Sequence, residues 1–240
     1  MRVEFRFKIN EIPIGYRLGI LSIIKEMIYN GSNEYYQKIF EQKKLNLKPF
    51  AYSTYIKNLS IKDQYITGDE LVVTVSSSSY EFMLNLLNGS KKRREYAYKN
   101  HDFLLISKRM LPVHNITSNS VIFHTKSPIL IESKNKRPVL SNEPNFEKEF
   151  QYIGSLLIKE FYQRQPYKPI QVVNAVMKKQ VIKEYLHQEF DNPIYLTTNK
   201  GLIHIQGHPE DLQALYDNGV GFRRSLGLGL LDVVEEVTDN

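Results

Sequence analysis

Four glycines near the C-terminal end constrain the fold of this chain more than any other feature. Gly219, Gly221, Gly227 and Gly229 form two Gly-x-Gly pairs that enclose the segment FRRSL. Glycine permits a positive φ and the close approach of another backbone, so such a loop can present N–H groups to a phosphate. A dinucleotide-binding fingerprint follows a strand and opens a helix, whereas here a predicted helix precedes the glycines and a predicted strand follows them. We therefore discard a nicotinamide site, and two interpretations remain: phosphate binding, or tight packing between a helix and a sheet.

The first half of the chain predicts the order strand, helix, strand, strand, helix, strand. Residues 2–9 alternate apolar and charged side chains, which is the period of a strand with one buried face. Residues 16–29 carry apolar side chains at helical spacing and are followed by Asn-Gly, a helix stop signal. The remaining predicted elements are strands at 50–55, 71–76 and 103–110 and a helix at 80–87. The second and third strands are expected to form a hairpin, which gives the ferredoxin-like βαββαβ order.

The same order repeats after Pro112. The patterns favour strands at 120–123, 129–131, 170–185, 201–206 and 228–237, and helices at 146–161 and 209–218. We therefore predict an α+β protein of two tandem ferredoxin-like domains with antiparallel sheets. The domains are expected to span residues 1–115 and 116–240, with their connection near 112–119.

The composition favours a polyanionic partner. The chain has 32 Lys and Arg against 26 Asp and Glu, a net charge of +6. It has no cysteine, which excludes disulfides, thiolate zinc sites and a cysteine nucleophile and fits a cytoplasmic location. No apolar run approaches the roughly 18 residues of a membrane span, so no membrane association is expected. The acidic residues show no paired spacing typical of a two-metal nuclease.

Four segments along the chain together point to one protein family. The most specific is GVGFRRSLGLGLLDVV, which begins at Gly219 and runs from a helix into a last strand. The others are KPFAYS from Lys48, FHTKSPILI from Phe123, and GLIHIQGHPEDLQALYDNG from Gly201. In these segments and their order, nearly the whole chain resembles the CRISPR repeat-processing endoribonuclease family of the repeat-associated RNA-binding (RAMP) superfamily.

The resemblance implies an endoribonuclease that cuts precursor crRNA within its repeats without a metal or other cofactor. The RNA's own 2′-hydroxyl attacks, which gives a 2′,3′-cyclic phosphate and a 5′-hydroxyl. Expected partners are CRISPR repeat RNA and a CRISPR effector complex, and the protein is expected to be a monomer or homodimer. The expected RNA-binding residues of the glycine segment are Gly219, Gly221, Arg223, Arg224, Ser225, Gly227 and Gly229.

One departure from the family pattern concerns catalysis. The family's histidine ahead of the KPF-like strand is absent, because all six histidines lie beyond residue 100 and the expected place falls near Glu41 or Gln42. Lys48 matches the family's basic residue, and its ammonium is expected to stabilise charge in the transition state. The other candidates are Lys25, Tyr36 and Lys44, for which solvated or packing roles are the alternative. The missing histidine leaves a second hypothesis, a non-catalytic repeat-RNA-binding subunit of an effector complex. A third is a generic single-strand RNA binder built on the same βαββαβ unit.

The densest basic cluster is the run Lys91, Lys92, Arg93 and Arg94, with Tyr96 and Tyr98 close behind. Cations interleaved with aromatic rings suit phosphate contacts and base stacking, so we predict RNA binding here. The same run also fits an exposed hairpin tip.

Overall fold

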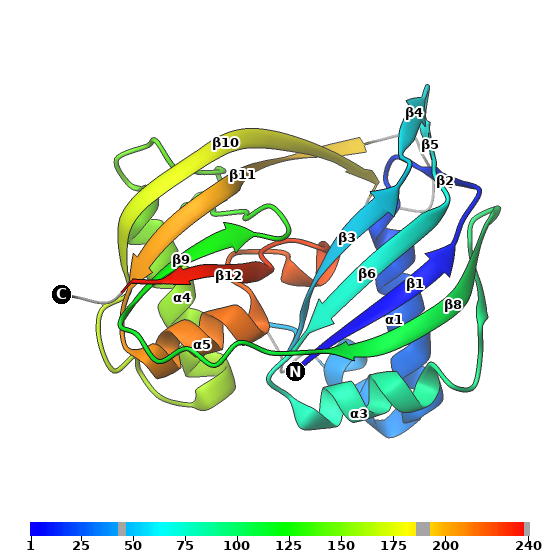
Figure 1. Ribbon diagram of the computed structural model, residues 1–240, viewed down its shortest axis with the longest axis horizontal. Helices are drawn as coiled ribbons and strands as arrows, with labels where there is room; N and C mark the ends of the chain where they lie inside the picture. The colour runs from blue at the N-terminus through cyan, green and yellow to red at the C-terminus, as the bar shows by residue number, and fades with distance from the viewer. Residues whose placement is uncertain (43–46, 186–192, 238–240) are drawn as a thin grey trace.

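The computed structural model describes residues 1–42, 47–185 and 193–237. It contains two large antiparallel sheets side by side, each covered on one face by two helices (Figure 1). A third, small antiparallel sheet is formed by three short strands. The predicted class, an α+β protein of two tandem ferredoxin-like domains, is confirmed.

The N-terminal sheet has a ferredoxin-like strand order. In space its antiparallel strands run β3 (Ala51–Lys57), β6 (Glu70–Ser76), β1 (Arg2–Lys8), β8 (His101–Leu111) and β7 (Glu95–Tyr98). Helices α1 (Arg17–Gly31) and α3 (Tyr80–Gly89) cover one face. The alternation in β1 buries Val3, Phe5 and Phe7 beneath these helices. The expected pairing of the second and third strands is confirmed, because β3 pairs with β6 along its whole length.

Several short elements of this domain have no counterpart in the sequence-based prediction. They are too short for a periodicity to be recognised. These elements are β2 (Glu11–Pro13), α2 (Asn33–Tyr36), a π-helical turn η1 (Gln37–Glu41), β4 (Ser60–Lys62) and β5 (Tyr65–Thr67).

The C-terminal sheet repeats the same order. Its strands run β10 (Gln171–Tyr185), β11 (Pro193–Gln206), β9 (Ser120–Thr125) and β12 (Leu231–Glu236). Helices α4 (Phe146–Tyr162) and α5 (Pro209–Asn218) pack on one face of this sheet. The long strands β10 and β11 arch toward the N-terminal sheet (Figure 1).

The strand predicted at residues 129–131 was wrong. The segment makes only an isolated bridge between Ile129 and Asn199. Instead it runs beside the glycine segment, where Leu130 O accepts a 2.8 Å hydrogen bond from the backbone of Phe222 and Pro128 O accepts one from Gly229. Pro128 cannot donate to a strand ladder, which accounts for the break.

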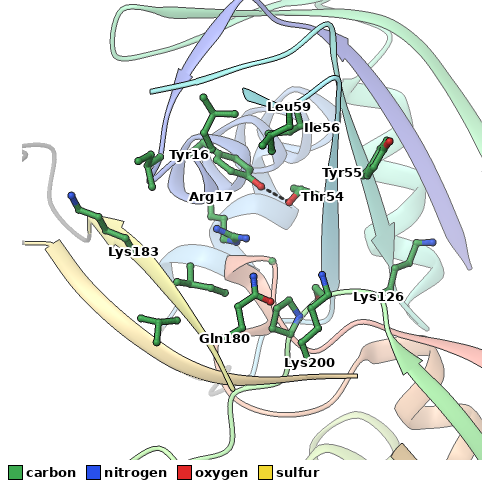
Figure 2. A pocket seen from close by; sticks show the side chains of 17 residues that line it. Tyr16, Arg17, Thr54, Tyr55, Ile56, Leu59, Lys126, Gln180, Lys183 and Lys200 are labelled. Carbon is green, nitrogen blue, oxygen red and sulfur yellow. Dashed lines mark hydrogen bonds between the residues drawn. The ribbon is translucent and has the colours of Figure 1, made fainter. Parts of the chain in front are cut away.

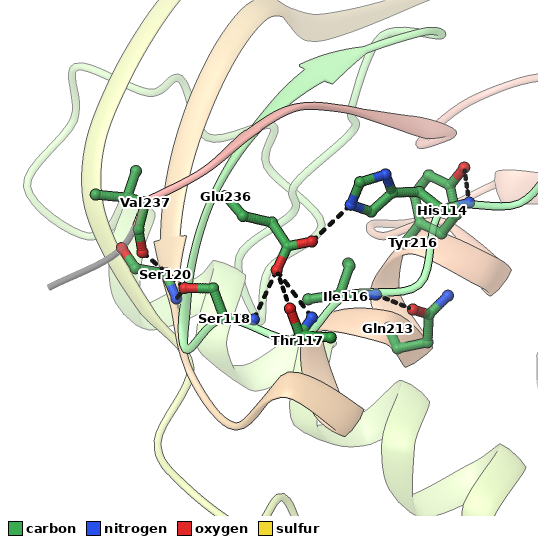
Figure 3. A network of polar contacts seen from close by, with 9 residues as sticks. All are labelled: His114, Ile116, Thr117, Ser118, Ser120, Gln213, Tyr216, Glu236 and Val237. Atoms are coloured by element: carbon green, nitrogen blue, oxygen red, sulfur yellow. Dashed lines mark hydrogen bonds and ion pairs between the residues drawn. The ribbon is translucent and has the colours of Figure 1, made fainter.

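Residues 112–119 connect the two halves and contain neither helix nor strand. Glu236 of β12 holds this connection by accepting hydrogen bonds from the backbone of Thr117 at 2.8 Å and of Ser118 at 2.6 Å, and by pairing with His114 at 2.6 Å (Figure 3). The His114 contact lowers the pKa of Glu236 to about 2, with the backbone donors adding to the effect.

No helix of the described part of the chain has the length and hydropathy that a membrane span requires.

Candidate functional site

The glycine loop, residues 219–229, has the backbone that its composition predicts. Gly219, Gly221, Gly227 and Gly229 have φ of 71°, 95°, 74° and 74°. These values lie in the left-handed region, which other residues enter at a cost. The conformational part of the prediction is therefore confirmed.

The glycine loop also packs closely against itself and its neighbours. A Cβ on Gly229 would lie 1.9 Å from Val220 O, and one on Gly221 would lie 2.6 Å from Leu130 O. The backbone N–H groups of Val220, Phe222 and Gly229 all donate to carbonyls of the protein. At least these three donors are therefore used inside the molecule, and tight packing explains part of the glycine pattern.

The loop also reaches the N-terminal domain. A Cβ on Gly227 would lie 2.6 Å from the ring of Tyr52, a buried residue of β3. The Tyr52 hydroxyl donates to Arg17 O at 2.7 Å, and Ser127 Oγ donates to Tyr52 O at 3.2 Å. The glycine loop thus lies in the interface between the two domains.

The two loop arginines have different surroundings. Arg224, in the short 3-10 turn η2 (Arg224–Leu226), is buried and donates to Asn218 O at 2.5 Å and to Lys48 O at 3.0 Å. Its burial lowers the pKa of the guanidinium to about 9. Arg223 is exposed, and Ser225 is half-buried. Of the two arginines expected to contact RNA, only Arg223 faces solvent in this structure.

Three of the four predicted catalytic residues gather around the ring of Phe40. The ammonium groups of Lys25 and Lys48 lie 5.2 and 5.5 Å from the ring centroid, and the Tyr36 ring centroid lies 5.3 Å away. Lys48 Nζ also donates to Ile39 O. Burial, and then the charge of Lys25, lower the pKa of Lys48. The fourth candidate, Lys44, lies outside the described residues.

The backbone of Lys48 is hydrogen-bonded to the glycine loop. Arg224 of the loop donates to the backbone of Lys48, so a single side chain joins the lysine cluster to the loop.

Four of the histidines have partners of their own, and His187 lies outside the described residues. The ring of His101 bonds Glu11 O at 2.8 Å, His204 bonds Ser120 Oγ at 2.7 Å, and His208 accepts from the backbone of Glu210 at the start of α5. His114 pairs with Glu236, as described above. No group of three or more His, Asp or Glu among the described residues is placed to hold a metal.

A cleft between the domains was missed by the sequence-based prediction. It has a volume of about 470 Å³ and lies between the start of α1, strand β3 and the β10–β11 hairpin, with Gly227 at its wall. Figure 2 shows side chains from both domains pointing into it. None of its lining residues is acidic, and its cationic lining residues are Arg17, Lys126, Lys183 and Lys200.

These cations are dispersed along the chain, so no run of basic residues marks them. Of the four, only Lys183 could have been noticed in the sequence, because it belongs to the lysine-rich strand β10. The run at 91–94 lies elsewhere: it follows α3 at the sheet edge formed by β8 and β7, whereas β3 is the edge strand that faces the cleft.

Comparison with known proteins found a family model that matches the sequence and solved structures with a similar fold. A family model described as CRISPR associated protein Cas6, C-terminal, matches residues 111–233, just over half of the chain. No curated protein sequence matches significantly.

Three solved structures share the whole fold. One, from work on a Cas6-related gene from Pyrococcus furiosus, has a TM-score of 0.84 at 20% identity over 99% of both chains. A RAMP protein described as binding different RNA substrates has a TM-score of 0.79 at 19% identity, over 98% of this chain and 100% of that one. A CRISPR associated protein Cas6 has a TM-score of 0.74 at 21% identity, over 98% of this chain and 99% of that one. At these identities the likeness establishes a shared fold.

Proposed function

The chain belongs to the CRISPR-associated Cas6 family, and from this membership and the geometry of the site we propose that it binds CRISPR repeat RNA and cuts precursor crRNA within the repeats. One observation carries the proposal beyond the family. Arg224 of the glycine loop hydrogen-bonds the backbone of Lys48, which supports a single site that includes the lysine cluster and the loop. The cationic cleft borders the same loop at Gly227.

The cleft supports the binding half of this proposal. Arg17, Lys126, Lys183 and Lys200 line it, and a polyanion that enters would exchange its counterions for these side chains. Tyr55, which is 66% exposed, offers a ring for an unpaired base to stack on. Arg223 and the glycine loop would hold the RNA backbone where the cleft ends.

The lysine cluster supports the cleavage half. The 2′-oxygen would attack the neighbouring phosphorus and lose its proton to a base, while the P–O5′ bond breaks and the 5′-oxygen takes up a proton. The products would be a 2′,3′-cyclic phosphate and a 5′-hydroxyl. The phosphorane gains negative charge on its non-bridging oxygens, and the Lys48 ammonium is placed to stabilise that charge, with Lys25 and Tyr36 beside it.

The test is to incubate the protein with a repeat RNA in EDTA. We expect a single cut whose upstream fragment ends in a cyclic phosphate. Cleavage that requires added metal would overturn the metal-independent mechanism. Tight binding without any cut would instead assign the chain to the non-catalytic subunits, and equal competition by unrelated RNAs would indicate a generic RNA binder.

Lys48→Ala provides the matched active-site variant. Since its proposed interaction forms only in the transition state, single-turnover cleavage should slow by about 10²- to 10³-fold while repeat affinity stays nearly constant. Lys38→Ala is the control, because Lys38 is an exposed lysine of η1 that pairs with Glu81. Equal rates for wild type and Lys48→Ala would remove Lys48 from the mechanism.

A further inference from the structure

A second cationic pocket lies on the N-terminal domain, between the end of α3 and strand β8. It has a volume of about 290 Å³. Three of its lining residues are cationic, two carry hydroxyls and none is acidic. The lining residues are Ser90, Lys91, Arg94, Leu105, Ile106, Ser107 and Lys108.

Strand β8 places Lys108 in this pocket by means of a β-bulge. Leu105 pairs with Phe7 and Lys108 pairs with Phe5, both of which are core residues under the helices. Strict alternation would put residues three apart on opposite faces of a sheet. The register shift between these pairs turns Lys108 to the helix face instead.

The cationic groups of the pocket are held in position. Lys108 Nζ donates to Ser90 Oγ at 2.7 Å. Arg94 donates from Nε to Leu105 O at 3.2 Å and from Nη2 to Ile106 O at 3.4 Å. Each side chain keeps further N–H groups for a ligand, since an ammonium has three donors and a guanidinium has five.

The C-terminal end of α3 does not account for this cluster. Its last carbonyls would attract cations if they lacked donors. They have donors already, because Ser90 N–H donates to Leu86 O, Ser90 Oγ to Leu87 O, and the backbone N–H groups of Lys91 and Lys92 to Asn88 O and Gly89 O.

Carboxylates do not account for it either. Among the ion pairs of the described residues, none includes Lys91, Arg94 or Lys108, whereas their neighbour Arg93 pairs with Glu26 at 2.6 Å. Within the basic run, Arg93 thus has an acidic partner, whereas Lys91 and Arg94 face an open pocket.

We propose that this pocket binds a phosphate of the RNA backbone where the strand extends beyond the cleft between the domains. The inference rests on the proposed function. Three cationic side chains and no carboxylate line the pocket, which suits a phosphate with its several acceptor oxygens. Burial, and then Lys91, lower the pKa of Lys108, and a bound phosphate would offset both effects.

The position of the pocket determines which RNAs can reach it. It lies at the edge of the sheet formed by β8 and β7, whereas the cleft lies against β3 at the other edge. An RNA that fills only the cleft would leave the pocket empty. A longer RNA could contact both, and the pocket would then raise affinity for precursor RNA over short fragments.

The experiment compares two RNAs on the full-length chain. A short RNA of about 8 nucleotides matches the size of a single binding groove, and a long one of about 40 nucleotides extends well past it. The test variant combines Lys91→Ala with Lys108→Ala. The control combines Lys148→Ala with Lys159→Ala, which removes the same charge at two exposed lysines of α4, outside the pocket.

For the long RNA, we expect the test variant to lose roughly tenfold in affinity relative to the control and to lower the salt slope by about 1.4, or 0.7 for each lost contact. Affinity for the short RNA should not change. Equal affinities of the two variants for the long RNA would overturn the inference and leave the proposed function standing. Failure of the wild type to bind either RNA would overturn the proposed function first.

A third arm identifies the source of the phosphate. Inorganic phosphate is compared with chloride at equal ionic strength, and the melting temperature is measured. Stabilisation of the wild type but not of the test variant, without any difference in long-RNA binding, would assign the pocket to free phosphate and overturn its assignment to the RNA strand.

Discussion

The surroundings of Lys48 predict the pH dependence of cleavage. Burial and the charge of Lys25 hold the pKa of Lys48 below its usual 10.5. If the ammonium is the active form, the rate falls as pH rises through this lowered pKa. Lys25→Gln removes the repulsion and raises the pKa of Lys48, so the alkaline limb of the single-turnover profile should move to higher pH.

The midpoint of that limb is the informative quantity, because Lys25→Gln is also expected to lower the rate itself. Uncatalysed RNA hydrolysis at each pH is subtracted. A limb that stays in place after Lys25→Gln, or a profile that levels off near neutrality, would indicate that a group other than Lys48, such as a histidine, controls the rate.

The two loop arginines are expected to differ when each is replaced by alanine. Arg224→Ala leaves Asn218 O and Lys48 O without their donor and should lower the free energy of unfolding by about 2 to 3 kcal/mol in a urea titration. Arg223→Ala should leave stability nearly unchanged, since Arg223 is exposed, and should reduce the salt slope of RNA binding by about 1. The prediction is wrong if both variants lose the same stability.

At the scale of elements, periodicity was a good guide to long segments and a poor one to short segments. The alternation of β1 and the helical spacing of α4 predicted their bounds closely, because each buries one regular face. The segment at 129–131 looked like a strand because it is apolar, but it is buried beside the glycine loop without a ladder of its own. The bulge in β8 changes which face Lys108 occupies, and no pattern in the sequence announces it.

The contact between α1 and α3 gives a prediction at the same scale. A Cβ on Gly89 would lie 1.7 Å from Met27 O, which belongs to the backbone of the facing helix. Alanine has the higher helix propensity by about 1 kcal/mol, but the overlap requires the helices to separate. We therefore expect Gly89→Ala to lower the free energy of unfolding by about 1 to 3 kcal/mol.

Gly154→Ala in α4 is the matched control. Its Cβ would meet the side-chain ends of Ile170 and Leu215 at 3.1 and 3.7 Å, and these can shift. Urea unfolding should place this variant near the wild type. If the two substitutions cost the same, the close approach of α1 and α3 is not what requires glycine at 89.

At the scale of the whole molecule, the fold could be predicted from the sequence and much of the site could not. The βαββαβ order follows from the hydrophobic periodicity of each element. The same order of periodic segments in each half of the chain therefore predicted both domains. The cleft cations come from four separate places in the chain: Lys126, Lys183 and Lys200 belong to the C-terminal half, and Arg17 joins them when the domains dock. Arg224 appeared in the sequence as one of two adjacent loop arginines, and only the folded structure shows that it is buried against the backbone of Lys48.

Arg2 of β1 makes several contacts across the interface between the two domains. Its guanidinium donates to Tyr216 O at 2.8 Å and Leu231 O at 2.6 Å, pairs with Asp232 at 3.1 Å, and lies 3.7 Å from the centroid of the Tyr216 ring. All these partners belong to the C-terminal half. Arg2 therefore connects the domains that we propose to divide at residues 115 and 116.

Replacement of Arg2 tests this division. Arg2→Ala leaves two buried carbonyls without donors and should lower stability by about 3 kcal/mol, the cost of breaking a buried charged contact. Because the lost contacts lie between the domains, unfolding should separate into two steps, seen as urea transitions that differ between tyrosine fluorescence and far-UV circular dichroism. Arg6→Ala is the control, since Arg6 lies on the same strand with a partly exposed side chain and pairs with Glu4 within its own domain. The inference is wrong if the two transitions of Arg2→Ala coincide and shift no further than those of Arg6→Ala. The two halves would then unfold as one cooperative unit, and their docking would not depend on Arg2.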